Sequence, residues 1–268
     1  MDWHSYDSIA SDYARISQHA YFDQPARDLI SLLDPPTNGR LCDLGCGTGA
    51  VLQAATAFMA REALITGIDL SVPMLTEARR TMRAALVAGR LPHLPFAGES
   101  LDSVTLGFVI QHLANPAPLL AEISRVLRVR GRIGMTCWAD SASDNDAGRV
   151  WSEVSRKYVD LEEIQRALDE ALPGTNAYRE LETFASVPEV AGFEIVAAET
   201  RTYPIVIDTG LWIASRALST GPRFVRSRLT EPVWHDLVDE VAARLNSDFG
   251  QTLPIETQVN FVVAAKSD

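Results

Sequence analysis

The stretch from residue 41 to residue 52 constrains this chain most, because it reads as a strand, a tight turn and the start of a helix. A short apolar run containing Asp43 leads into three glycines at alternate positions, Gly45, Gly47 and Gly49, and then into a second apolar run. Glycine is needed where the backbone takes conformations that a side chain disfavours, or where it contacts a ligand. The first N–H groups of the following helix are free and carry a partial positive charge. The stretch therefore predicts a turn that cradles a nucleotide.

The residues around the turn bear on which nucleotide it binds. Gly45, Gly47 and Ala50 also satisfy the dinucleotide pattern G-x-G-x-x-G/A, so the glycines alone do not separate NAD from another adenosine cofactor. Asp43 lies two residues before the first glycine, where a carboxylate repels a pyrophosphate but suits a ligand with an ammonium group. Asp69 ends the next apolar run, at the place where adenosine cofactors present their ribose hydroxyls. Together the two acids favour an adenosine cofactor with an amino-acid end.

Two motifs carry a resemblance to a known family. On the D-x-G-x-G-x-G segment from Asp43 to Gly49, and on the D-x-S-x-x-M-L segment from Asp69 to Leu75, the chain resembles the class I S-adenosylmethionine-dependent methyltransferases. It is most similar to their small-molecule branch, methyltransferase type 11, which includes the ubiquinone and menaquinone biosynthesis enzymes. The resemblance covers residues 5–138 by motif and the remainder by architecture. It implies S-adenosylmethionine as the cofactor, S-adenosylhomocysteine as the product, and no metal.

The resemblance also implies roles for individual residues. The turn would hold the methionine end of the cofactor, Asp69 the ribose, and Leu70 and Met74 the two sides of the adenine, while a backbone N–H at Leu91 reaches the ring. Tyr13 belongs to a Tyr-x-Arg segment that folds over the cofactor in relatives, although a helix packed on the core edge is the alternative. The candidate cofactor-binding residues are Tyr13, Asp43, Gly45, Cys46, Gly47, Asp69, Leu70, Met74, Leu91 and Phe108.

One segment departs from the family pattern. Relatives carry an acid before the Leu94-Pro95-Phe96 segment, and its carboxylate binds the adenine amine; here Arg90 stands in that region. A guanidinium cannot accept a hydrogen bond, so the adenine amine needs another acceptor, such as a backbone carbonyl or a water.

The order of the patterns predicts an α/β fold, a Rossmann-like doubly wound sheet. We expect helices before residue 34 and over 51–58, strands over 64–69 and 101–108, and a helix that ends at residues 130–132 before a strand over 133–138. A sixth strand is expected over 192–204 and a last one over 259–266. The resemblance implies a seven-stranded sheet, mostly parallel, with the last strand inserted antiparallel between the fifth and the sixth.

The same patterns divide the chain into segments. Residues 1–138 would form the N-terminal helices and the cofactor-binding core, residues 139–189 a helical lid insertion, and residues 190–268 the last two strands with a helical insertion at about 207–250. Both insertions would stand above the carboxyl edge of the sheet and cover the pocket.

Reactive groups are expected between Gly107 and His112, because ligands of open α/β sheets lie at the switch point outside the carboxyl ends of the strands. His112 is the nearby side chain with a near-neutral ordinary pKa, which makes it the candidate general base; packing and helix entry are the alternative role. Trp138 and Trp212 are candidates for lining the substrate pocket, with core packing as the alternative. The segment lacks the N/D-P-P-Y-like motif of base and amide methyltransferases, which favours carbon or oxygen acceptors.

Composition limits the partners. The formal net charge of −11 and the pI of about 4.9 disfavour nucleic acid and anionic membranes as partners. The three cysteines, Cys42, Cys46 and Cys137, fit neither a disulfide framework nor a zinc site. Residues 1–30 carry five acids and no long apolar run, so we expect no signal peptide and a cytoplasmic protein that acts on a small molecule. Its assembly, monomer or homodimer, stays open.

Three functions are compatible with these patterns. The first is methylation of a small, apolar or aromatic metabolite at carbon or oxygen, a reaction that needs no acid because the leaving thioether departs neutral. The second is an S-adenosylmethionine-binding protein on the same fold that transfers no methyl, either cyclase-like or regulatory. The third, a nicotinamide-dependent oxidoreductase, is disfavoured by Asp43 and by the antiparallel last strand.

Overall fold

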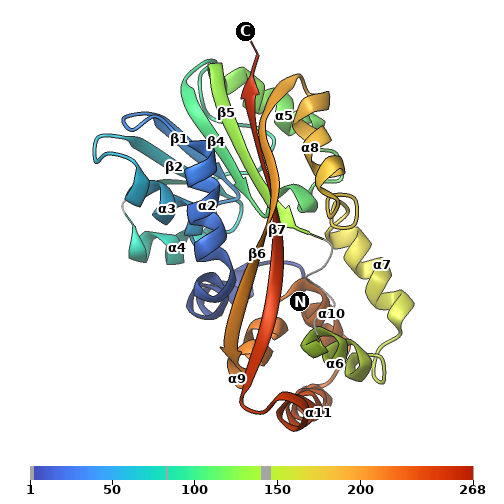
Figure 1. The fold of residues 1–268 in the computed structure, drawn as a ribbon. Helices are drawn as coiled ribbons and strands as arrows, with labels where there is room; N and C mark the ends of the chain where they lie inside the picture. Colours follow the sequence, from blue (N-terminus) through green and yellow to red (C-terminus); the bar gives the residue numbers. More distant parts are fainter. Residues whose placement is uncertain (1–2, 83, 140–145, 268) are drawn as a thin grey trace.

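The computed structural model describes residues 3–82, 84–139 and 146–267. Its centre is a seven-stranded sheet with the strand order β3-β2-β1-β4-β5-β7-β6 (Figure 1). All neighbouring strands are parallel except that β7 runs antiparallel to both β5 and β6, which confirms the predicted fold class. The strands are Arg40–Leu44 (β1), Leu64–Asp69 (β2), Ala85–Ala88 (β3), Leu101–Gly107 (β4), Leu127–Trp138 (β5), Phe193–Asp208 (β6) and Thr252–Lys266 (β7).

Helices precede the sheet, connect its strands and form the insertions. Before β1 lie Asp7–Ile9 (η1), Ala10–Asp12 (α1), Tyr13–Phe22 (η2, a π-helix) and Asp23–Leu33 (α2). The connecting helices are Ala50–Phe58 (α3), Val72–Thr81 (α4), Ile110–His112 (η3) and Ala117–Val126 (α5). The later helices are Asp146–Ser155 (α6), Leu161–Ala171 (α7), Leu181–Val190 (α8), Thr209–Ala217 (α9), Thr220–Ser227 (α10) and Glu231–Phe249 (α11).

The sheet is sandwiched between two layers of helices. On one face, apolar side chains of α2 and α3 pack on β7, with Leu29 and Leu33 fully buried. On the other face, α5 and α8 pack on the sheet, and Phe184 of α8 is fully buried there. Central parallel strands covered on both faces form continuous apolar runs, which is why β1 is apolar apart from Asp43 and the exposed Arg40 at its start.

A second core lies around the far halves of β6 and β7. These two strands form a long antiparallel ribbon that leaves the sheet (orange and red in Figure 1). The helices α6, α7, α9, α10 and α11 pack around it and bury three tryptophans: Trp151, Trp212 and Trp234. One residue of this helical unit, Ala171 of α7, lines the cavity described below.

The predicted boundary between α5 and β5 is wrong. The helix expected to end at residues 130–132 ends at Val126, and β5 begins at Leu127 rather than at residue 133. The reason is a bulge: Leu127 pairs with Leu101, but the next pair is Arg132 with Ser103, so four residues of β5 stand opposite one of β4. Polar residues in this bulge gave the segment the appearance of a helix end.

Other strand bounds also differ from the expectation. β3 was not expected, because it has only four residues at the sheet edge and most of them are exposed. β6 and β7 extend beyond the expected ends at residue 204 and residue 259. Both extensions alternate exposed and covered residues, the pattern of strands with one covered face.

Candidate functional site

A cavity of about 700 Å³ opens at the carboxyl ends of β1, β2 and β4. This is the switch point of the sheet, because the chain builds outward in opposite directions from the neighbouring strands β1 and β4. Eleven of the sequence-predicted site residues line it: Tyr13, Asp43, Gly45, Cys46, Gly47, Asp69, Leu70, Met74, Leu91, Phe108 and His112.

The glycine turn presents bare backbone to this cavity. Gly45 and Gly47 both have positive φ, at 67° and 52°. The N–H groups of Gly45 and Cys46 both donate to the carbonyl of Ile68, at 2.7 and 3.0 Å, which ties the turn to β2. A Cβ at Gly45 would lie 2.5 Å from a methyl group of Val109, whereas a Cβ at Gly47 would meet no protein atom within 4 Å. The space beside Gly47 is therefore left for a ligand that contacts the backbone.

Asp69 joins the end of β2 to the turn. One carboxylate oxygen accepts from the N–H of Gly47 at 2.8 Å, and the other accepts from the N–H of Ser71 at 2.8 Å. Burial raises the pKa of Asp69, while these backbone hydrogen bonds oppose the increase. Each carboxylate oxygen has a further lone pair, so Asp69 can accept hydrogen bonds from two hydroxyls in the cavity.

Asp43 is the deepest acid of the cavity, with only 1% of its surface exposed. Its carboxyl accepts a hydrogen bond from the hydroxyl of Thr105 at 2.7 Å. Burial raises the pKa of Asp43 to about 7; the Thr105 hydrogen bond lowers it and the negative charge of Asp69 raises it further. A cation bound next to Asp43 would stabilise the charged carboxylate and reverse part of that increase.

These groups fit the amino-acid nucleoside that the sequence predicts. The bare backbone at Gly47 leaves room for close approach, Asp69 supplies acceptors for ribose hydroxyls, and Asp43 supplies an anion for an ammonium group. A dinucleotide would instead bring a doubly charged pyrophosphate next to these two acids.

The apolar side of the cavity is formed by Leu91, Met74 and Leu70. Met74 is buried, and Leu70 stands at the rim with 62% of its surface exposed. Arg90 is exposed and also lines the cavity, in keeping with a position at the rim.

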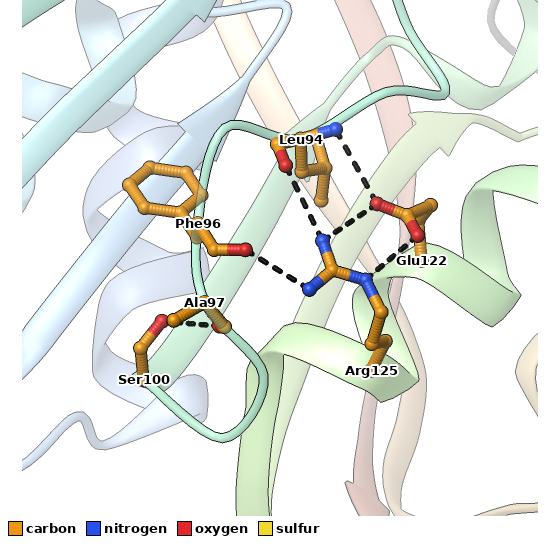
Figure 2. Close-up of polar contacts among 6 residues, drawn as sticks. All are labelled: Leu94, Phe96, Ala97, Ser100, Glu122 and Arg125. Carbon is orange, nitrogen blue, oxygen red and sulfur yellow. Dashed lines mark hydrogen bonds and ion pairs between the residues drawn. The ribbon is translucent and has the colours of Figure 1, made fainter.

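The loop that carries Leu91 is fastened to α5 by hydrogen bonds with Arg125 and Glu122, which form an ion pair with each other within that helix (Figure 2). The guanidinium of Arg125 binds the carboxylate of Glu122 through two nitrogens, at 2.8 and 2.9 Å. It also donates to the carbonyls of Phe96 at 2.9 Å and Leu94 at 3.3 Å. Because its planar guanidinium donates hydrogen bonds to a carboxylate and to two carbonyls at once, Arg125 holds the loop in one conformation.

Replacing Arg125 by methionine is expected to loosen the loop without unfolding the protein. Amide hydrogens of residues 93–100 should exchange at least about tenfold faster, since charge-assisted bonds to their backbone are lost. Hydrogen exchange measured by mass spectrometry checks this. Arg80→Met is the control, because Arg80 forms the same kind of i,i+3 pair with Glu77 within α4. Equal exchange in the loop of both variants would contradict the assignment.

Aromatic rings form the opposite wall. Phe108 follows β4 with a φ of 58°, unusual for a residue other than glycine, and its ring lies 5.1 Å from Phe22. Tyr13 stacks on Phe22 at 5.7 Å. Trp138 lies one layer behind, 4.5 Å from Phe108, and supports the wall rather than lining the cavity.

Trp212 is not brought to this site. It is buried in the second core, 6.3 Å from Trp151, which corrects its expected place in the cavity wall. A large ring with 4% of its surface exposed packs where the insertion helices meet, and core packing was the alternative reading of this residue.

His112 lies in the cavity wall, but not with the expected pKa. Desolvation by the surrounding protein and the positive charge of Arg223 both lower its pKa below the ordinary value. The expectation of a near-neutral pKa is therefore wrong, and the imidazole is neutral at pH 7. In this state it can accept a hydrogen bond from an acceptor hydroxyl, but it is a weak base.

The sequence missed the contribution of residues 4–7. His4, Ser5, Tyr6 and Asp7 all line the cavity. The hydroxyl of Ser71 donates to the carboxylate of Asp7 at 2.6 Å, which brings this segment next to Asp69. Tyr6 directly precedes the first helical turn, and no local motif marks such a segment as part of a site.

In the part of the chain that the structure describes, no three His, Cys, Asp or Glu side chains are grouped as metal ligands. Among the same residues, no helix combines the length and the apolar character that a membrane crossing requires.

Comparisons with known proteins agree with this geometry. A profile of the family described as "Methyltransferase domain" matches residues 42–135. A demethylmenaquinone methyltransferase of Lactiplantibacillus plantarum is 31% identical over 170 residues, which are 58% of this chain and 70% of that protein. One from Roseiflexus sp. (strain RS-1) is 41% identical over 103 residues, or 37% of this chain, but the match spans only 43% of that protein.

A solved structure shares the fold over most of its length. It comes from Anaeromyxobacter dehalogenans and is assigned as a type II methyltransferase, with a TM-score of 0.64 and 17% sequence identity. The alignment covers 91% of this chain and 96% of that chain.

Proposed function

Because the chain belongs to the class I S-adenosylmethionine-dependent methyltransferases, we propose that it transfers a methyl group to a small, apolar or aromatic metabolite, at carbon or oxygen. The observation that carries this proposal is the composition of one cavity. Bare backbone at Gly47 and the carboxylates of Asp69 and Asp43 lie on one side, and a wall of aromatic rings lies on the other.

We propose that the cofactor side of the cavity is formed by the first three strands and their turns. Asp69 accepts hydrogen bonds from the ribose hydroxyls, the turn at Gly45–Gly47 contacts the amino-acid end, and Asp43 pairs with its ammonium group. Met74, Leu70 and Leu91 enclose the adenine. Tyr13 faces the sulfonium, where an aromatic ring offers a favourable cation–π contact.

When bound, S-adenosylmethionine supplies a methyl group on a positively charged sulfur that leaves as a neutral thioether. The protein's contribution is alignment and water exclusion, which in favourable cases lower a barrier by about 7–11 kcal/mol. Phe108 and His112 hold the acceptor beside the cofactor, with the neutral imidazole accepting a hydrogen bond from an acceptor hydroxyl. No acid–base pair is needed unless the acceptor reacts after losing a proton.

Several properties of the whole protein belong to the proposal. We propose a cytoplasmic enzyme of secondary metabolism that uses no metal and binds neither nucleic acid nor membrane. Free thiols at Cys42, Cys46 and Cys137 and the net charge of −11 support this. We also propose that the two insertions, residues 139–189 and 207–250, cover the acceptor; Ala171 of α7 in the cavity lining supports this for the first insertion, of which residues 140–145 lie outside the described residues. Light scattering would decide between monomer and homodimer.

Incubation with S-adenosylmethionine labelled in the methyl group tests the proposal. Phenols, quinols and enolic ketones are offered as acceptors, and labelled product is expected for at least one class. It should be absent with Asp69→Ala. Tight cofactor binding with no methyl loss to any acceptor would instead indicate the protein that binds without transferring.

Asp43 is expected to make cofactor binding stronger as the pH rises. Only the ionised carboxylate pairs with an ammonium group, and its pKa is about 7 in the free protein. The association constant for S-adenosylhomocysteine should therefore rise about fivefold from pH 6 to pH 7 and level off above pH 8. Calorimetric titration at several pH values measures this rise, and Asp43→Asn should abolish it. An affinity that falls with pH would contradict the role of Asp43.

The raised pKa of Asp43 also makes the stability of the cofactor-free protein depend on pH. Between the ordinary pKa of 3.8 and about 7, the folded state holds a proton on Asp43 that the unfolded state has lost. Stability from this group therefore decreases as the pH rises through that window.

A further inference from the structure

The helix α10 of the second insertion reaches across to the cavity through two residues on one face. Thr220 and Arg223 are three positions apart, so their side chains lie next to each other on the helix surface. Arg223 has only 7% of its surface exposed, and its guanidinium lies 4.7 Å from the centre of the Tyr6 ring. The side chain of Thr220 also interacts with that of Tyr6. One tyrosine is thus held by two residues of the insertion.

The backbone around Tyr6 is fixed to the same helix. Arg223 donates to the carbonyl of Ser5 at 2.7 Å and to that of His4 at 3.5 Å. Next to Arg223, the ring of Phe224 lies 5.0 Å from Trp3. The segment from Trp3 to Tyr6 therefore follows α10, while the following residue, Asp7, is bound to the core through Ser71.

Tyr6 faces the aromatic side of the cavity. Its ring makes edge-to-face contacts with His112 and with Tyr13, each at 5.9 Å between ring centres. His112 belongs to the switch point of the sheet and Tyr13 to the helix over the cavity. Tyr6 is therefore the part of the wall that connects the acceptor side of the site with α10.

We propose that Tyr6 determines acceptor specificity, and that Arg223 and Thr220 are positioning residues that set the angle of its ring. The acceptor class is a planar aromatic ring with a polar substituent, which packs against Tyr6 and places the substituent at His112. This rests on the proposed function, because it concerns the acceptor side of the same cavity. Rings held before binding lose little freedom when they contact a planar ligand, and aromatic pairs favour defined geometries.

The positioning role is tested without any methyl transfer. Hydrogen exchange is measured in Arg223→Met, Arg223→Lys and Thr220→Val, with Arg226→Met as the control on the same helix. Arg226 lies over Trp234 and pairs with Glu231, away from Tyr6. Amides of residues 4–9 should exchange at least about tenfold faster in Arg223→Met, because the guanidinium contacts are lost. Arg226→Met should leave them unchanged.

Exchange in residues 4–9 that stays at the wild-type rate overturns the positioning role, whether or not the protein transfers methyl. Should Arg223→Met fail to fold, Arg223→Lys and Thr220→Val are read by the same criterion, with at least about threefold faster exchange expected.

The specificity role is tested on the acceptor. In Tyr6→Ala, kcat/KM for a planar aromatic acceptor should fall at least about tenfold relative to that for a non-planar one, mainly through KM. Tyr6→Phe keeps the ring but loses the contact with Thr220, so the ratio should fall clearly less than in Tyr6→Ala. S-adenosylhomocysteine affinity should change less than about threefold in both variants. An unchanged ratio in Tyr6→Ala overturns the assignment of Tyr6. If the wild-type protein transfers no methyl group to any acceptor, the proposed function is refuted. The hydrogen-exchange experiment would then still show whether α10 positions Tyr6.

Discussion

Replacing Asp69 by alanine is expected to weaken S-adenosylhomocysteine binding about a hundredfold, the largest effect of any single change at this site. The substitution removes the acceptors proposed for both ribose hydroxyls. It also leaves the N–H of Gly47 and that of Ser71 without the carboxylate that orders the turn. Because hydrogen bonds to charged groups are the stronger ones, both losses should be visible in one calorimetric titration.

Asp160→Ala is the matched control. Asp160 is also an acid whose side chain accepts a backbone N–H, that of Glu162 at the start of α7, but it does not line the cavity. It should retain the wild-type affinity. Binding by Asp69→Ala within about threefold of the wild type would show that the second acid does not hold the cofactor.

Gly47→Ala should mainly weaken cofactor binding, whereas Gly45→Ala should mainly lower the stability of the fold, although both residues belong to the same turn. Both positions have positive φ, so either change costs about 1–2 kcal/mol of stability. At Gly47 the new methyl group meets no protein atom and occupies ligand space, which should weaken S-adenosylhomocysteine binding by about thirtyfold. At Gly45 it would lie 2.5 Å from a methyl group of Val109, so the additional loss falls on folding.

The measurements are a thermal unfolding curve and a calorimetric titration for each variant. Gly45→Ala should have the lower Tm, and Gly47→Ala should have the weaker affinity. A Gly47→Ala protein that binds as well as the wild type would contradict close contact between the cofactor and this backbone.

The glycine turn and the acid at the end of β2 could be predicted from the sequence, because each depends only on residues that are close together in the chain. Gly45 and Gly47 take the positive φ values that alternating glycines predict, and Asp69 ends β2 beside them. The strands β1, β2 and β4 could be predicted because each contains a short apolar run that is at least partly buried. The edge strand β3 could not, because its four residues are mostly exposed.

The remaining features depend on residues that are distant in the sequence. Arg223 reaches Tyr6 across more than two hundred positions, and no spacing rule predicts that contact. The lowered pKa of His112 arises from burial and from Arg223, neither of which its neighbours in the sequence reveal. Trp212 shows the same limit, because an aromatic residue in an insertion can line a pocket or fill a core, and only the packing of β6 and β7 decides between them.

A crystal structure of the protein grown with saturating S-adenosylhomocysteine tests the central claim most directly. We expect the nucleoside in the cavity at the switch point, its ribose hydroxyls hydrogen-bonded to Asp69, its amino group beside Asp43 and its backbone contact at Gly47. A cavity that stays empty under these conditions, or one that holds NAD with its pyrophosphate on the turn, would contradict the account.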